Sequence, residues 1–204
     1  MLTAFHQNTW KKSLHPFTPE YLHRHPCDTI MITIKVQENN PLTQKSYNNL
    51  LSSLQFHQLT CPSCRHAACL HIHCYYTRYI KQNSSKVPVR ICRVICSHCD
   101  STHAILPSSV VPYSQLPLTD HAAAAASYLS SRPTAAILTM DNQLDHSSLR
   151  YSVKQFLRHW YQRIGSYSLS LHSLNELVAA CFEHFSRQFM QNKRTLNILF
   201  VDTT

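Results

Sequence analysis

The chain of 204 residues contains one glycine, Gly165, and only ten acidic side chains. Without further glycines it cannot form the glycine-rich loops that cradle phosphates, so Walker and dinucleotide-binding motifs are excluded. The Asp and Glu residues are scattered, so the clustered carboxylates that hold the metal ions of nucleases and transposases are lacking. The zinc-deaminase, H-E-x-x-H and G-x-S-x-G signatures are absent as well. The sequence therefore predicts that the protein is not an enzyme.

Long apolar runs are also lacking. No segment approaches the roughly 18 apolar residues that a membrane helix needs, and residues 1–17 lack the apolar core of a secretory signal. We therefore expect a cytoplasmic protein with no membrane partner. In a reducing cytosol, the nine cysteines are expected to bind metal rather than to form disulfides.

Two C-x-x-C pairs are the most specific motif in the chain. Each pair folds as a tight turn, here called a knuckle, whose two sulfurs point inward, and four thiolates satisfy the tetrahedral demand of Zn²⁺. Such a site is closed to water and therefore structural rather than catalytic. The predicted zinc ligands are Cys61, Cys64, Cys96 and Cys99.

The residue that follows each pair departs from the common pattern. Glycine often stands there, because the position favours a positive φ, but this chain has Arg65 and Asp100. A second metal near Cys69, His73 and Cys74 is an open alternative to alternating side chains of a strand. Other thiols, such as Cys181 on the apolar side of a predicted helix, are expected to be buried hydrophobic groups.

The hydrophobic pattern predicts an α+β fold. Strands are expected over residues 28–36, 71–81, 87–95 and 103–106, the middle two as a hairpin, with a short helix over 46–56. After a proline-rich linker, helices are expected over residues 120–130, 133–140, 146–164 and 173–191. Predicted end signals are an N-cap at Thr119, a left-handed C-cap at Gly165 and a capping box from Ser173 to Glu176.

These elements predict three domains. Residues 1–58 form a small N-terminal α/β segment of unknown role, and residues 59–107 form a four-cysteine zinc ribbon. Residues 118–200 form a helix-turn-helix-like helical domain, whose third helix would enter the major groove of DNA.

The charge of the chain favours a polyanionic partner. Nineteen Lys and Arg side chains against ten Asp and Glu give a net charge of +9, which points to nucleic acid. Basic side chains are interleaved with tyrosines in the predicted hairpin and form a stripe on the predicted third helix. The alternative is a solvated basic surface. The predicted nucleic-acid-binding residues are Tyr75, Arg78, Tyr79, Lys81, Arg90, Arg93, Arg150, Lys154, Arg158 and Arg163.

Three stretches resemble a bacterial family of unknown function that is associated with mobile elements, domain of unknown function number 6431. They are LTCPSCRHAACLHIHCYYTRYIK, VRICRVICSHCDSTHAILPSSVVPYSQLPL and FSRQFMQNKRTLNILF, within Leu59 to Phe200. The family looks like the zinc-ribbon front end of transposases. The resemblance implies the same four cysteine ligands and a link to transposition.

The sequence therefore predicts a zinc-dependent DNA-binding protein of a mobile element, which recognises the element's ends or regulates its transcription. One alternative is a protein-interaction module whose zinc ribbon docks on a transposase. Another is a binder of single-stranded RNA or DNA that uses the tyrosine-rich strand. DNA specificity and oligomeric state are not determined by the sequence.

Overall fold

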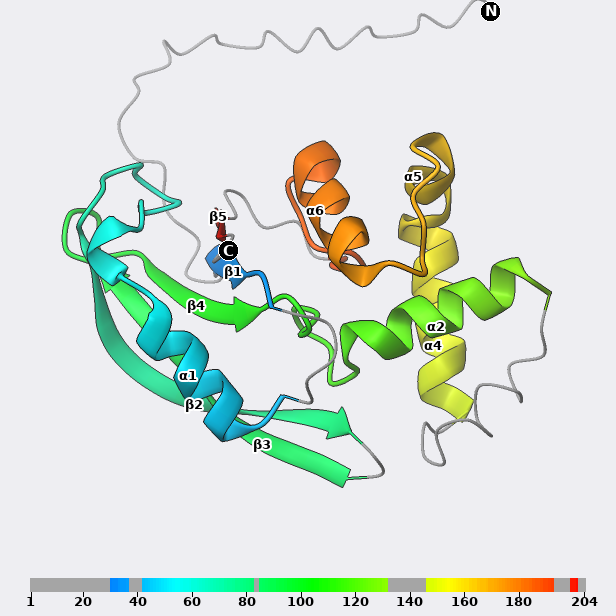
Figure 1. The fold of residues 1–204 in the computed structure, drawn as a ribbon, viewed down its shortest axis with the longest axis horizontal. Coiled ribbons are helices and arrows are strands. Elements are labelled where there is room, and N and C mark those ends of the chain that lie inside the picture. The colour runs from blue at the N-terminus through cyan, green and yellow to red at the C-terminus, as the bar shows by residue number, and fades with distance from the viewer. Residues whose placement is uncertain (1–29, 37–41, 83–84, 132–145, 193–198, 202–204) are drawn as a thin grey trace, which may run out of the picture.

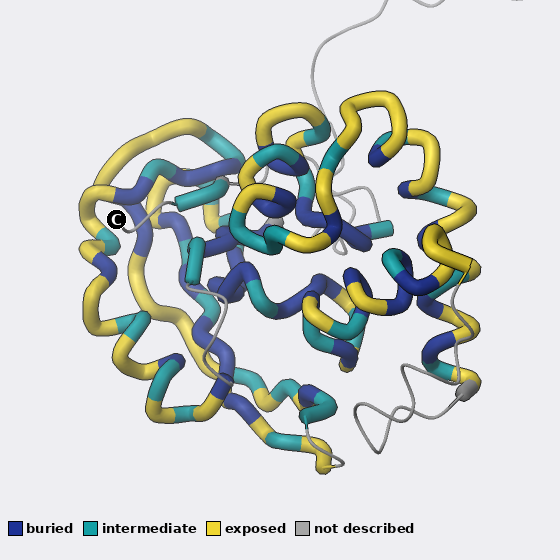
Figure 2. Tube along the Cα trace, turned by 45° about the vertical axis from the view of Figure 1, so that its right-hand side comes forward, coloured by how far each residue is buried: buried dark blue, intermediate teal, exposed yellow. Residues whose placement is uncertain are grey.

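The structure, a computed structural model, describes residues 30–36, 42–82, 85–131, 146–192 and 199–201. Over these residues the fold is α+β, as predicted, with a five-stranded sheet beside a group of helices (Figure 1). Figure 2 shows the buried residues gathered in the interior, with the exposed residues on the outside. The helix predicted over residues 133–140 lies outside the described residues. No helix in the described part of the chain combines the length and apolarity needed to span a bilayer.

The sheet has the strand order β2-β3-β4-β1-β5. One edge of the sheet is a hairpin of β2 (Leu70–Gln82) and β3 (Ser85–Cys96), and β4 (Thr102–Pro107) pairs antiparallel with β3. Strand β1 (Ile30–Ile34) lies parallel to both β4 and β5 (Leu199–Val201). The predicted strands are confirmed, and strands from all three predicted segments share this one sheet.

Helix α1 (Gln44–Ser53) packs on the sheet and is followed by the short 3-10 helix η1 (Phe56–Gln58). A capping box starts α1, because Thr43 Oγ1 accepts from the N–H of Ser46 while Ser46 Oγ accepts from the N–H of Thr43. The buried Tyr47 hydroxyl donates to the carbonyl of Ile105 and accepts from the N–H of Cys92, both at 2.9 Å. One phenol thus fixes α1 to β3 and β4 together.

Alternation along the hairpin separates its side chains into two faces. Residues directly opposite one another in an antiparallel pair lie on the same face, and the register pairs Tyr75 with Cys92 and Thr77 with Arg90. The opposite face carries Arg78, which is paired with Val89. The predicted nucleic-acid-binding residues of the hairpin are therefore divided between a face next to α1 and a face next to the segment after β4.

The helical part comprises α2 (Leu118–Leu129), α4 (His146–His159), α5 (Tyr161–Ser166) and α6 (Leu174–Phe185). Trp160 and Phe189 are fully buried at its centre, with ring centroids 5.3 Å apart. Phe182 of α6 stacks on Phe200 of β5, with centroids 4.4 Å apart, so the helices and the sheet edge are packed together.

Several predicted helix ends are wrong. The helix expected over residues 146–164 is interrupted at Trp160, and Gly165 lies inside α5 with no positive φ. The left-handed residue is Ser168, at φ 50°, in a Schellman motif in which Leu169 N–H donates to Ile164 O and Ser168 N–H to Gly165 O. A serine thus occupies the position for which glycine is usual.

Two further end signals are corrected. Helix α2 begins at Leu118, after Pro117 at the N-cap, so Thr119 is already helical. Ser173 is the N-cap of α6, but its side chain makes no capping hydrogen bond, and α6 ends at Phe185 rather than near residue 191. The chain turns at Ser186, whose φ is 52°, and this turn brings Phe189 back into the helical core.

Candidate metal centre

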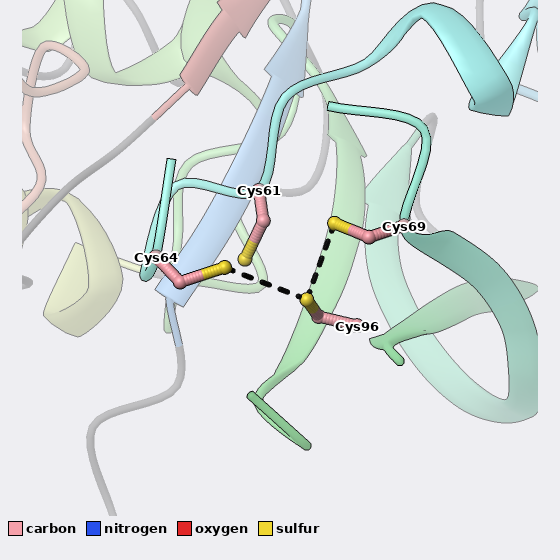
Figure 3. Close-up of side chains that lie close together, drawn as sticks. All are labelled: Cys61, Cys64, Cys69 and Cys96. Carbon is pink, nitrogen blue, oxygen red and sulfur yellow. Dashed lines mark hydrogen bonds between the residues drawn. The ribbon is translucent and has the colours of Figure 1, made fainter. Parts of the chain in front are cut away.

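Four thiols converge at one end of the hairpin. The Sγ atoms of Cys61, Cys64, Cys69 and Cys96 all lie within 4.8 Å of one another (Figure 3). Cys61 and Cys64 come from the first knuckle, Cys69 stands just before β2, and Cys96 ends β3. A cluster of this composition could hold a metal ion, which supports the coarse prediction of a metal site.

Both knuckles have the backbone that the motif requires. The N–H of Arg65 donates to the carbonyl of Cys61, and the N–H of Asp100 donates to the carbonyl of Cys96, each at 2.9 Å. Arg65 has φ 65° and Asp100 has φ 55°. The two positions at which glycine was expected are therefore left-handed, although both carry side chains.

Backbone N–H groups of each knuckle point at its first sulfur. Cys61 Sγ accepts from the N–H groups of Ser63 and Cys64, and Cys96 Sγ accepts from those of His98 and Cys99. Such hydrogen bonds stabilise a thiolate. In each knuckle, these hydrogen bonds thus favour the thiolate form of one cysteine, which is the form that binds metal.

The pKa values of the thiols reflect a competition between burial and hydrogen bonding. Burial raises the pKa of the Cys61 thiol and raises that of Cys69 to about 11. Burial also acts to raise the pKa of Cys96, but its contact with the Cys69 thiol, at an Sγ–Sγ distance of 3.2 Å, and the backbone N–H groups outweigh burial and lower the pKa to about 6. Cys96 is therefore the preferred thiolate of the cluster.

The sulfur spacings fit a tetrahedral zinc ion. Four sulfurs at about 2.3 Å from Zn²⁺ lie about 3.8 Å from one another. Cys61 and Cys99 are 3.8 Å apart, and Cys64 and Cys96 are 3.7 Å apart. Three of the predicted ligands belong to the group of four close thiols, and the fourth, Cys99, lies at ligand spacing from Cys61.

Cys69 is the thiol that the spacing motif did not assign to this site. It reaches the cluster because the register of the hairpin pairs Leu70 with Cys96, which places the preceding residue beside the end of β3. Its thiol also donates to the carbonyl of His66 at 3.1 Å. His73 and Cys74, the suggested partners of Cys69 in a second site, are exposed on β2 and lie in neither ligand-type cluster of the described residues.

His103 supports the cluster from the sheet. Its ring is fully buried on β4, and Nε2 lies 3.3 Å from Cys61 Sγ. A hydrogen bond of this kind orients a sulfur ligand and tunes its basicity. The sequence gives only a weak signal for this role of His103, because the residue lies beyond the second knuckle.

The basic side chains of the hairpin have different environments. Arg78 donates to the carbonyls of Val111 and Ser114, each at 2.6 Å, and burial lowers its pKa. This guanidinium holds the segment after β4 against the hairpin and is not presented to a phosphate. Arg93 is half-buried over the ring of Tyr76, at 5.2 Å from its centroid.

A second group of hairpin residues faces solvent. Tyr75, Tyr79 and Arg90 are exposed, and Arg90 lies 5.4 Å from the ring centroid of Tyr75. Tyr75 and Arg90 line a groove of about 640 Å³ between the hairpin and α1. Lys81 extends from β2 to α4, where its Nζ donates to Ser148 Oγ at 3.1 Å.

Helix α4 presents a basic stripe. Arg150, Lys154 and Arg158 are exposed, whereas Leu149 and Phe156 are buried against the rest of the helical part. The fourth predicted residue, Arg163 of α5, is half-buried instead, with its guanidinium 5.3 Å from the ring centroid of Trp160.

The fold and the site define an α+β protein with a thiol-rich candidate metal centre. A family model described as a domain of unknown function (DUF6431) matches residues 61–142, which begin at Cys61 and include both knuckles. This region is therefore similar to that family, as the sequence suggested, over less than half of the chain. No curated protein and no solved structure matches the chain.

Proposed function

We propose that this protein binds duplex DNA through the basic stripe of α4, and that a zinc ion in the thiol cluster holds the hairpin in place beside it. In line with the resemblance of the sequence to a mobile-element family, the DNA is that of a mobile element, bound at its ends or at its promoter. The ion neutralises the thiolates and cross-links the two knuckles, and it has no catalytic role in this proposal.

The exposure of the stripe carries the proposal. Arg150, Lys154 and Arg158 follow one another at a spacing of four residues, so they lie on one side of the helix, and the helix has no acidic residue. A solvated helix of a monomeric bundle usually alternates charges of both signs. A row of one sign is suited to a row of phosphates instead.

The end of the hairpin that lies away from the thiol cluster extends this surface. The contact of Lys81 Nζ with Ser148 Oγ brings β2 to the first turn of α4. Lys86, which is paired with Lys81 across the hairpin, is exposed there, as is Tyr79. The hairpin and the helix would therefore contact one duplex from adjoining positions. The metal, at the opposite end of the hairpin, would anchor its two strands.

The salt dependence of DNA binding tests the proposal. The metal-loaded full chain is titrated onto duplexes from its own locus and onto random duplexes at several salt concentrations, with fluorescence anisotropy as the readout. We expect affinity to fall steeply with salt, and each of Arg150→Ala and Lys154→Ala to reduce the slope of log K against log salt by about 0.9.

Lys45→Ala is the matched control, because Lys45 is exposed on α1, outside the stripe. It should leave the slope unchanged. Absence of salt-sensitive binding to any duplex would overturn the proposal. Equal affinity for locus and random DNA would overturn only the link to element ends or a promoter.

The groove beside α1 favours a second candidate function, which is binding of single-stranded nucleic acid. Tyr75 and Tyr79 expose their rings and Arg90 adds a cation at the groove, an arrangement suited to a stacked base and its phosphate. Replacing Tyr75 and Tyr79 by Ala should then weaken single-strand binding by roughly 5- to 100-fold per lost base contact. Tyr128→Ala, at an exposed tyrosine of α2, should have no effect, and unchanged binding by the double variant rejects this candidate.

A further inference from the structure

The metal centre is surrounded by more donor groups than one ion can use. A tetrahedral zinc ion takes four ligands, and the two knuckles with the residue before β2 supply five thiols. Two imidazoles lie at the same place, since His66 follows the first knuckle and His98 lies within the second. Cys64 Sγ and ring nitrogens of His66 and His98 all lie within 4.8 Å of one another.

We propose that Cys64, His66 and His98 bind a second transition-metal ion of the Zn²⁺ or Co²⁺ type, with the thiolate of Cys64 shared between the two ions. The first ion lies among buried sulfurs, whereas the second faces solvent, because His66 and His98 are both exposed. Three protein ligands leave the fourth position open to water or to an external donor.

The two rings lie close enough together to bind one ion. Two imidazole nitrogens on a tetrahedral ion, each about 2.0–2.1 Å from it, lie about 3.4 Å apart. The rings of His66 and His98 are stacked with centroids 3.5 Å apart and planes 18° apart. Because the lone pair of a ring nitrogen lies in the plane of its ring, both exposed rings would have to turn about their Cβ–Cγ bonds to bind one ion, starting from donor atoms that already lie within 4.8 Å of one another.

The fold holds both histidines in position through their backbones. The carbonyl of His66 accepts from the N–H of Cys61 at 2.8 Å and from the thiol of Cys69 at 3.1 Å. The N–H of His98 donates to Cys96 Sγ. Each histidine is therefore fixed by the same hydrogen bonds that shape the first site, so the two imidazoles are brought together whenever the knuckles form.

The chemistry of this donor set differs from that of the first site. Imidazole nitrogens with one thiolate accept several first-row transition metals, whereas a set of thiolates alone favours soft or borderline ions such as zinc. An exposed ion with an open position should also exchange faster than a buried one. The second site depends on the first, because Cys64 belongs to both, but it does not depend on DNA binding.

Metal stoichiometry tests the proposal. The full chain, with any affinity tag removed, is loaded with Zn²⁺, dialysed against a zinc-buffered solution, and measured by elemental analysis and native mass spectrometry. We expect two ions for the wild-type chain, one for the His66→Ala, His98→Ala double variant, and two for His57→Ala, His71→Ala, which removes two exposed histidines outside the cluster.

Titration with Co²⁺ gives an independent readout. The first equivalent should produce the thiolate-to-cobalt charge-transfer absorption, and the second should add visible bands that are missing in the His66, His98 double variant. One ion in the wild-type chain overturns the second site, and two ions in both variants overturn its assignment to His66 and His98. No bound ion in the wild-type chain overturns both sites, while DNA binding is measured separately.

Discussion

At the scale of single residues, the two knuckles place non-glycine residues in left-handed backbone. Arg65 has φ 65° and Asp100 has φ 55°, and a side chain in this region costs about 1–2 kcal/mol relative to glycine. Asp tolerates the conformation better than Arg does, because its short side chain forms local hydrogen bonds. Arg65 is therefore the more strained of the two positions.

Arg65→Gly should stabilise the metal-loaded protein. Relief of strain exceeds the added backbone entropy of glycine in the unfolded chain, so we expect the free energy of unfolding to rise by about 0.5–1 kcal/mol. Urea denaturation provides the measurement. Ser63→Gly, in the same knuckle at a residue without a positive φ, should lower the free energy instead, and an equal effect of both changes would contradict the strain.

His121 is buried between α2 and α4, and its two ring nitrogens contact Ser152 Oγ at 2.7 Å and Ser114 Oγ at 2.9 Å. Burial lowers its pKa to about 4, from an ordinary value of 6.5. In the pH window between these values the unfolded chain binds the proton and the folded chain does not. Stability contributed by neutral His121 is therefore present above pH 6.5 and is lost as pH falls toward 4.

Lowering the pH from 7.5 to 5 should thus cost about 2 kcal/mol of the free energy of unfolding through His121. The His121→Gln variant keeps a polar side chain but does not titrate, so it should lose less stability over the same range. Urea midpoints of both proteins at both pH values give the difference, in which the acid sensitivity of the metal site cancels. Identical pH dependence would show that His121 does not contribute.

At the scale of elements, a phenol of α1 bonds two strands of the sheet at once. Strands β3 and β4 are paired from Arg93 with Ala104 to Ile95 with Thr102. At the next position before Arg93, outside this pairing, the Tyr47 hydroxyl bridges Cys92 N–H and Ile105 C=O. A side chain thus continues the hydrogen bonding where the strands separate. Tyr47 is fully buried, and burial raises its pKa.

Tyr47→Phe should lower the free energy of unfolding by about 2–3 kcal/mol, because it leaves a buried N–H and a buried carbonyl without this partner. Tyr79→Phe is the matched control, since Tyr79 is exposed, and it should change stability little. Chemical denaturation monitored by circular dichroism gives both values. Similar stability of the two variants would show that water replaces the phenol.

The sequence predicted the strands and the antiparallel hairpin correctly, because β-branched runs and the link between β2 and β3 are local signals. It could not predict that β1 lies between β4 and β5, since parallel pairing is decided by contacts far apart in the chain. The helix ends were the least predictable. The helix is interrupted at Trp160 although the apolar pattern continues through this residue, and Ser168 rather than Gly165 adopts the left-handed turn.

The candidate metal site was likewise only partly predictable from the sequence. The C-x-x-C spacing identified Cys61, Cys64 and Cys96, whereas Cys69 joins them through the pairing of Leu70 with Cys96. The composition of the hairpin indicated a basic surface, but only the structure separates the clamping Arg78 from the exposed Arg90. A motif reports which groups are near in sequence, and burial decides which of them remain accessible.

At the scale of the whole molecule, the candidate metal ligands lie in or against one of the three hydrophobic clusters of the described residues. Cys61, Cys69 and Cys96 are buried in the core of the sheet and α1. The main core of the helical part, around Phe156 and Trp160, contains none of the candidate ligands. Metal binding should therefore stabilise the two parts unequally.

Removing the metal with a chelator should loosen the sheet first. We expect amide hydrogen exchange at the end of β3 and the start of β2 to accelerate by about tenfold or more, while amides of α6 change little. Exchange of the metal-loaded and chelated full chain, followed by mass spectrometry, measures both at once. Equal acceleration in both parts would indicate one cooperative unit, and no acceleration would contradict a structural ion.

The position of β1 has a consequence for how the chain is made. The hairpin pairs residues that leave the ribosome in succession. By contrast, Ile32 can pair with Leu199, and Thr33 with Phe200, only after β5 has been synthesised. Contacts of such separation form slowly. Among the described strands, only β5 pairs with the edge of β1 that faces away from β4, and an unpaired strand edge is where nascent chains associate wrongly. In the part of the chain that the structure describes, β5 thus protects the edge of β1 that faces away from β4.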